Sequence, residues 1–220
     1  MIEGVPLRIH SHPRSGTHLL AASIYQNFEF SDLVSSPTIR PGMKFVIGDK
    51  TWMPGQKLKI LWGKFLTNHN FYNPTWSKNP EKILYIVRHP IQSMISYWRI
   101  TDPQCQNDPE EHIGEGRMRF WQKHVDGYTQ NCHWVRYEDL VGEQYDKTLD
   151  KIQHWFNLTP KNDTWGRVKD RVGWYSIEEP IQDKQPTPKI TKKFKEFFPK
   201  GYLGYDMDVL GEYDETTGIG

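Results

Sequence analysis

The chain has 220 residues, of which 28 are basic and 27 acidic, and its formal net charge of +1 excludes a general binder of nucleic acid or another polyanion. Aromatic residues make up 14% of the chain, which favours a folded protein over a disordered one. Two cysteines, Cys105 and Cys132, form neither a disulfide framework nor a zinc-type cluster. We therefore expect free thiols in a reducing compartment.

Neither a targeting segment nor a membrane segment is expected from the sequence. The first predicted strand begins within about five residues of Met1, so no signal peptide is expected. No run of 18 apolar residues occurs, so no membrane span is expected. These features predict a cytoplasmic protein without a membrane partner.

The first predicted unit is a strand over residues 5–9, a turn that contains Gly16, and a helix whose apolar residues recur every four positions. This arrangement points backbone N–H groups and the positive end of a helix at an anion. Arg14 adds a fixed positive charge with several donors. The segment predicts a phosphate-binding loop, although an ordinary turn with an exposed arginine has the same pattern.

Strands and helices alternate along the rest of the chain, which predicts one α/β domain over residues 1–220. In a parallel α/β sheet, ligands bind at the carboxyl ends of the strands. Residues 165–189 have no assignable pattern, and the tail after about residue 206 is expected to fray. The further predicted strands are 44–47, 58–67 (or a tight hairpin), 82–87 and 132–136. One further predicted helix begins at Pro90, and the others cover 115–130, 142–157 and 190–198.

The turn around Gly16 departs from the nucleoside-triphosphate loop GxxxxGK[ST]. When Gly16 is aligned with the second glycine, Ser11 replaces the first glycine. Thr17 then replaces the lysine, and His18 replaces the hydroxyl that binds magnesium. The loop is therefore predicted to hold a phosphate without the usual magnesium ligand, with Arg14 supplying the positive charge.

A second anion-binding element is predicted where the buried strand 82–87 ends. Arg88 follows this strand, and Ser96 lies eight residues later on the next helix, away from its apolar stripe. An arginine at a strand end and a hydroxyl two turns into the following helix can converge on one anionic group. Taken alone, a surface arginine and a helical serine would be unremarkable.

These elements together resemble the sulfotransferases that use 3′-phosphoadenosine-5′-phosphosulfate (PAPS). The family's loop [KR]SGT[TS], which binds the 5′-phosphosulfate, is matched by Arg14, Ser15, Gly16 and Thr17, and His18 stands at its last position, where the family has Thr or Ser. His18 is expected to bind the phosphate through its backbone N–H. The family's Arg and Ser that hold the 3′-phosphate are matched by Arg88 and Ser96, and its RYEDL segment, whose Tyr lies near the adenine, is matched around Tyr137.

The resemblance implies a three-layer α/β/α fold like that of P-loop-containing nucleotide hydrolases, with a central parallel sheet of about 4–5 strands. It also implies a compact member of the bacterial or viral type. The implied activity is transfer of a sulfuryl group from PAPS to a hydroxyl or amine, with 3′-phosphoadenosine 5′-phosphate (PAP) as product and no metal. Positioning and charge stabilisation should dominate such a transfer.

The predicted general base is His69, which resembles the His of the family's Lys-Thr-His segment; a histidine pKa near neutrality suits this task. Because some branches of the family use a carboxylate, Asp49 is the alternative. Thr67 stands where the family has its lysine. Arg14 would then stabilise the leaving phosphate alone, or with another cation such as Lys50 or Lys64.

Two further positions depart from the aryl sulfotransferase pattern. Leu19 stands where the family often has a tryptophan, three residues after the loop glycine, so adenine stacking has to come from elsewhere. The C-terminal RKGxxGxW segment has only partial matches, at 171–174 and 198–201, and Arg171 is the favoured ligand of the 3′-phosphate. The candidates for adenine stacking are Trp52, Trp174 and Tyr137.

Two other functions stay open at this point. A P-loop kinase would use ATP and magnesium on a small molecule, but the missing GK[ST] counts against it. An inactive nucleotide-binding protein is supported only by Thr67. Without a basic stripe, a small-molecule acceptor is expected, bordered by loops 70–80, 101–116 and 173–189.

Overall fold

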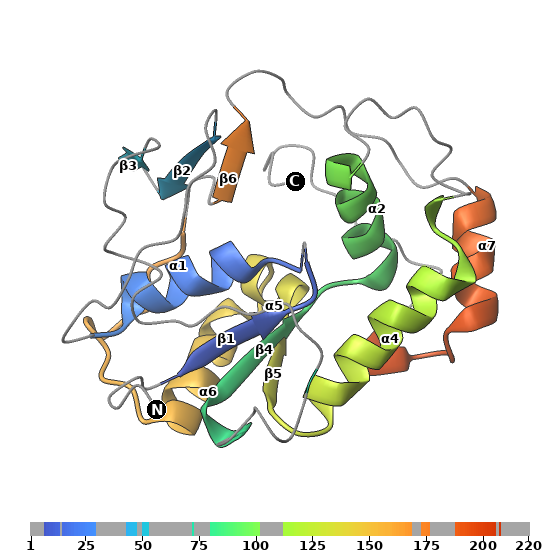
Figure 1. Cartoon of the computed structure of the whole chain (residues 1–220). Helices are drawn as coiled ribbons and strands as arrows, with labels where there is room; N and C mark the ends of the chain where they lie inside the picture. Colours follow the sequence, from blue (N-terminus) through green and yellow to red (C-terminus); the bar gives the residue numbers. More distant parts are fainter. Residues whose placement is uncertain are drawn as a thin grey trace.

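A parallel β-sheet lies at the centre of the protein (Figure 1). The computed structural model describes residues 7–13, 15–29, 43–47, 50–52, 72, 80–101, 112–168, 173–176, 188–205 and 207. Within these ranges the sheet has three strands in the order β1-β4-β5. The strands are β1 (Arg8–Ser11), β4 (Ile83–Val87) and β5 (His133–Arg136).

The predicted strand 82–87 is the middle strand β4, and all five of its residues are buried. Its side chains alternate between two hydrophobic cores: Leu84 and Ile86 belong to one, and Tyr85 and Val87 to the other. Burial on both faces explains why this strand is continuously apolar.

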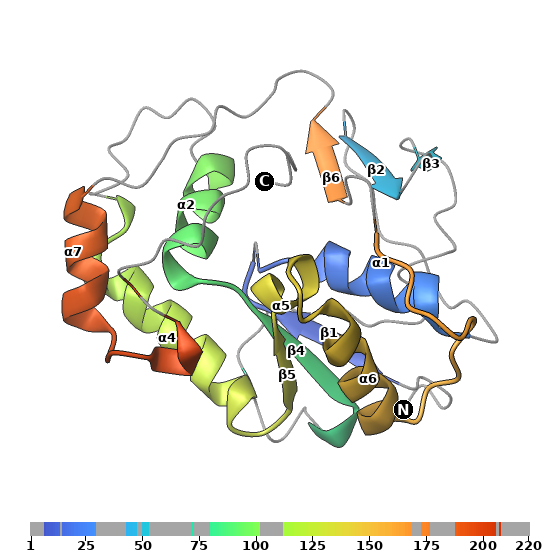
Figure 2. The same cartoon turned by 180° about the vertical axis from the view of Figure 1, so that it is seen from behind.

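Helices cover both faces of the sheet, which confirms the predicted α/β/α layering (Figures 1 and 2). On one face lie α1 (Thr17–Asn27), α5 (Tyr137–Val141) and α6 (Tyr145–Phe156). On the other lie α2 (Pro90–Thr101), α4 (Glu115–Thr129) and α7 (Pro188–Phe197). Two short 3-10 turns, η1 (Pro80–Lys82) and η2 (Tyr202–Gly204), complete the described helical elements.

A second, antiparallel sheet accompanies the parallel one. Its described strands are β2 (Met43–Ile47), β3 (Lys50–Trp52) and β6 (Gly173–Ser176), in the order β3-β2-β6. The strand predicted at 44–47 is therefore present but belongs to this sheet. The prediction of 4–5 parallel strands is not confirmed: the described residues form three, and 58–67 lies outside them.

The predicted helices agree with the structure except around residue 142. A helix was expected over 142–157, whereas α5 begins at Tyr137, ends at Val141, and is followed by α6. Gly142 separates the two helices, with extended φ and ψ angles of −96° and −162°. In the described part of the chain, no helix combines the length and apolar character needed to cross a membrane.

Candidate anion-binding site

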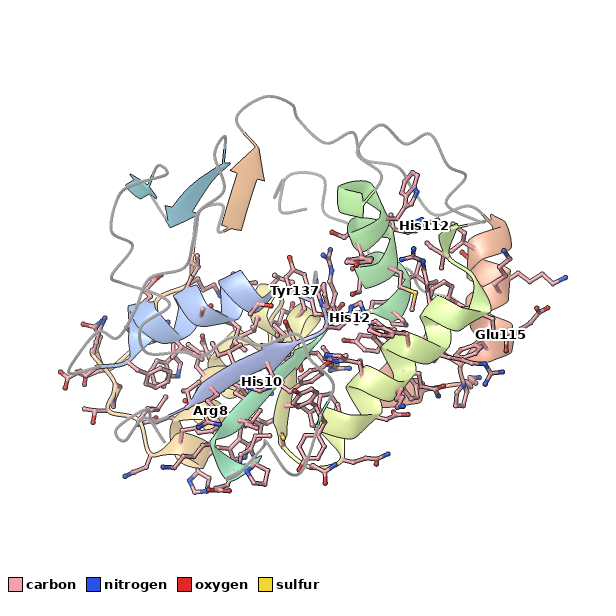
Figure 3. All side chains as sticks on the ribbon, viewed as in Figure 1. Arg8, His10, His12, His112, Glu115 and Tyr137 are labelled. Atoms are coloured by element: carbon pink, nitrogen blue, oxygen red, sulfur yellow. The ribbon has the colours of Figure 1, made fainter. Side chains whose placement is uncertain are left out.

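The carboxyl ends of the three parallel strands bring the predicted site segments together. β1 runs into the loop that precedes α1, β4 runs into Arg88, and β5 runs directly into Tyr137. Neighbouring registers place Ser11 beside Ile86 and Val87 beside Arg136. Figure 3 shows His12 and Tyr137 at this end of the sheet.

The loop after β1 leads into α1 through Gly16, which has a left-handed conformation with φ 90°. No side chain of the described residues caps α1, and its first turn holds no acidic residue. The first N–H groups of an α-helix have no partner within the helix and carry a partial positive charge. This end of α1 is therefore suited to an anion.

Hydrogen bonds inside the loop fix its shape. The Ser11 and Thr17 hydroxyls lie 2.5 Å apart and close the loop at its base. The backbone N–H of Ser15 donates to the carbonyl of His12 at 3.2 Å. Ser11 and Ser15 have no exposed surface. These contacts tie the described residues of the loop to one another.

Gly16 packs directly against the ring of Tyr137. A Cβ atom on Gly16 would lie 2.3 Å from Cδ2 of Tyr137 and 3.3 Å from Cδ1 of Ile86. The positive φ is also unfavourable for any side chain. Glycine is therefore required here both by the backbone angle and by the approach of the first strand's loop to the start of α5.

Arg88, which directly follows β4, forms the second part of the candidate site. Its guanidinium carbon is 4.6 Å from the centroid of the Tyr137 ring, a cation–π contact, and its Nε donates to Oε1 of Gln92 at 3.4 Å. Arg88 is 7% exposed. Within the described ranges no carboxylate forms an ion pair with it. Because a buried charge needs a partner, an anionic ligand is the natural complement to this guanidinium.

Ser96, the second predicted ligand of the same anion, lies on α2 and is buried. It follows Pro90, the first residue of α2, by six residues, or roughly 9 Å of helix rise. A group held by both Arg88 and Ser96 would have to reach along the first two turns of α2.

The backbone around Arg88 is fixed by Glu138 on α5. One carboxylate oxygen accepts the backbone N–H of His89 at 2.9 Å, and the other accepts the hydroxyl of Tyr205 at 2.8 Å. Burial, and then the nearby charge of Glu138, raise the pKa of Tyr205 well above its usual 10.0. The Tyr205 hydroxyl therefore stays protonated and continues to donate to Glu138.

Several predicted site residues lie outside the described residues: Arg14, Asp49, His69 and Arg171. For His18, only the backbone in the first turn of α1 is described. For Trp52 and Trp174, only the strand positions in β3 and β6 are described. The structure thus brings together Ser15, Gly16, Thr17, Arg88 and Tyr137 at the strand ends, with Ser96 on the adjoining helix α2.

Sequence reasoning missed three residues that shape this end of the sheet: His12, Ser93 and Glu138. Ser93 precedes Ser96 by three positions and so shares its helix face, which was a usable indication. Glu138 was part of the matched segment around Tyr137 but had no predicted role. Nothing local distinguished His12 from the other histidines.

No family model matches the chain, and no curated relative matches it. Among solved structures, it is similar to the crystal structure of mouse sulfotransferase SULT7A1 complexed with PAP, with a TM-score of 0.48 and 22% sequence identity. The match covers 71% of this chain and 59% of that chain, so less than two thirds of the mouse protein is spanned.

Proposed function

We propose that the chain is a PAPS-dependent sulfotransferase that acts on a hydroxyl or amine of a small molecule. The observation that carries the proposal is the buried Arg88, which has no carboxylate ion-pair partner among the described residues and stacks on Tyr137. Tyr137 in turn contacts Gly16, which precedes α1, a helix without a side-chain cap at its start. The two elements predicted to bind anions therefore meet at one aromatic ring.

The residues fit a nucleotide with phosphates at both ends of its ribose. The N–H groups at the start of α1 would hold the 5′-phosphate, together with Arg14, Ser15 and the Thr17 to His18 backbone. Arg88, Ser96 and Arg171 would hold the 3′-phosphate, because guanidinium groups and hydroxyls bind phosphate oxygens. Tyr137 would lie near the adenine; since Arg88 covers one part of its ring, the base would meet the remaining surface.

Bound PAPS would supply an activated sulfuryl group. In the transfer, the bond from sulfur to the 5′-phosphate oxygen breaks and a bond from sulfur to the acceptor oxygen or nitrogen forms. His69 takes the proton that the acceptor loses, with Asp49 as the alternative base. Arg14 stabilises the negative charge that develops on the leaving phosphate. The products are PAP and the sulfated acceptor.

We propose that residues 1–220 act as a single sulfotransferase domain in the cytoplasm. The two hydrophobic cores support a single domain, because both pack on the same three-stranded sheet. One core contains residues of α1, α5 and α6, and the other contains residues of α2, α4 and α7, so early and late described segments of the chain share one scaffold.

A thermal-shift comparison of PAP with ATP–Mg²⁺ tests the proposal. A ligand that binds only the folded state raises the melting temperature by mass action. PAP without a divalent metal should raise it, whereas ATP–Mg²⁺ should have a smaller effect. Stabilisation by ATP–Mg²⁺ alone would favour a P-loop kinase and reject the sulfotransferase.

A further inference from the structure

A single buried hydroxyl, that of Ser93 on α2, joins the loop after β1 to the helix that follows Arg88. Ser93 has no exposed surface. Its Oγ lies 3.4 Å from the carbonyl oxygen of Pro13, 3.4 Å from Oγ of Ser15 and 3.5 Å from Nδ1 of His12. Three groups of one loop therefore meet one side chain from another element.

One set of hydrogen positions gives three hydrogen bonds and leaves the 3.5 Å contact between Ser93 Oγ and His12 Nδ1 without one. His12 Nδ1–H donates to the Pro13 carbonyl at 2.9 Å, and the Ser93 hydroxyl donates to the second lone pair of the same oxygen. The Ser15 hydroxyl then donates to Ser93. This assignment follows from the network, since hydrogens are inferred from donors and acceptors.

The Pro13 carbonyl is thereby held on the side of the loop that faces α2. Its peptide unit lies immediately before Arg14, the residue proposed to bind the 5′-phosphate. His12 is anchored separately, because its backbone N–H donates to the hydroxyl of Tyr85 on β4 at 3.2 Å. The orientation of the loop thus depends on both β4 and α2.

Ser93 also lies between the two residues proposed for the 3′-phosphate. Arg88 precedes it by five positions and Ser96 follows it by three, on the same β4–α2 unit. The two 3.4 Å hydrogen bonds of Ser93 are long, and such contacts tighten when a ligand draws its binding groups together. A shift of α2 toward a bound phosphate would therefore also move the loop, through the hydrogen bonds of Ser93.

We propose that Ser93 is a positioning residue that couples the 5′-phosphate loop to the 3′-phosphate helix. The coupling makes the two anion-binding elements bind one doubly phosphorylated nucleotide better than either binds a single phosphate. This inference rests on the proposed function, because it assumes that the loop and α2 hold the two ends of the same ligand.

Binding of PAP and of 5′-AMP to the full chain tests the coupling by calorimetry without divalent metal. The two ligands differ only by the 3′-phosphate. The dissociation constant of 5′-AMP divided by that of PAP therefore reports the benefit of occupying both elements. Ser93→Ala should lower this ratio by roughly threefold or more, within the range by which coupling residues modulate linked sites. Ser23→Ala, which removes an equally buried serine side chain on α1, should leave the ratio unchanged.

A general loss of structure would weaken both ligands alike and leave the ratio at the wild-type value, which would overturn the inference. If Ser93→Ala does not fold, Ser93→Cys is measured instead, since it keeps a similar shape with a weaker donor. Ser93→Thr, which keeps a hydroxyl at this position, should keep the wild-type ratio. A low ratio in this variant would also contradict the coupling. If the wild-type chain binds 5′-AMP but not PAP, the proposed function fails first and the inference fails with it.

Discussion

Gly16 and Tyr137 are in such close contact that a single methyl group could not be placed between them. The Cβ position of Gly16 lies 2.3 Å from Cδ2 of the Tyr137 ring. This contact joins the loop after β1 to the first residue of α5, and Arg88 stacks on the same ring. The arrangement of the candidate site therefore depends on one glycine.

Gly16→Ala is expected to destabilise the fold by at least about 2 kcal/mol, because a positive φ and a steric overlap add. Chemical unfolding measures the free energy of unfolding, and binding of PAP should weaken as well. Gly116→Ala is the matched control: it lies in the first turn of α4 with open space around its Cβ position and should change the stability by no more than about 0.5 kcal/mol. Equal stabilities for the Gly16 variant and the wild type would contradict the described contact.

Arg88→Gln should weaken the binding of PAP by roughly ten- to a hundredfold, since hydrogen bonds to charged groups contribute about 1.5–3 kcal/mol. Arg88→Lys should recover only part of this loss, because lysine lacks the planar fork that binds phosphate and stacks on Tyr137. Arg119→Gln serves as the control, since Arg119 is exposed on α4 and paired with Glu115. A loss of PAP affinity in Arg119→Gln as large as that in Arg88→Gln would show that the loss comes from the change in net charge and not from a contact of Arg88.

His69→Ala should leave the dissociation constant of PAP unchanged while lowering kcat by about 10²–10⁴-fold, the usual contribution of a general base. The assay is sulfuryl transfer to an acceptor found by screening phenols, sugars and alkyl alcohols. His154→Ala, an exposed histidine on α6, should retain full activity. An unaltered kcat in His69→Ala would reject this base and direct the same test to Asp49→Asn.

The fold is expected to lose stability in alkali. Burial raises the pKa of the Cys132 thiol from 9.0 to about 12 and also raises the pKa values of Tyr85 and Tyr128 above 10.0. The unfolded chain therefore releases these protons at lower pH than the folded chain. Above about pH 9 the unfolded state binds fewer protons, so the free energy of unfolding falls as pH rises.

Chemical unfolding from about pH 8 to about pH 11 measures this dependence, and Cys132→Ala should make the decline shallower from about pH 9 upward. Tyrosinate absorbance should show the buried tyrosines ionising together with unfolding. An unfolding free energy that stays constant over this range would show that these groups are not protected by burial.

The strands and helices that position the site were predictable because their patterns are local. The buried strand β4 is continuously apolar, and Pro90 suits the first position of α2. By contrast, β6 was missed because it is defined by pairing with β2, about 130 residues earlier in the chain. A pairing across such a separation leaves no local periodicity for sequence reasoning to use.

The candidate site divides in the same way. Gly16 could be proposed from the turn between the first predicted strand and helix, Arg88 from the end of the strand 82–87, and Tyr137 from the resemblance of its segment to RYEDL. The role of Ser93 could not, because it depends on the distances from one hydroxyl to Pro13 and Ser15 after folding. The same holds for Glu138, whose partners His89 and Tyr205 are far away in the sequence.

The most direct test of the sulfotransferase assignment is the affinity of the wild-type chain for PAP relative to 5′-AMP, measured by calorimetry with all divalent metal removed. The account predicts that PAP binds at least about tenfold more tightly, because the 3′-phosphate gains charge-assisted hydrogen bonds from Arg88 and its neighbours. Equal affinities, or no binding of PAP, would contradict the account.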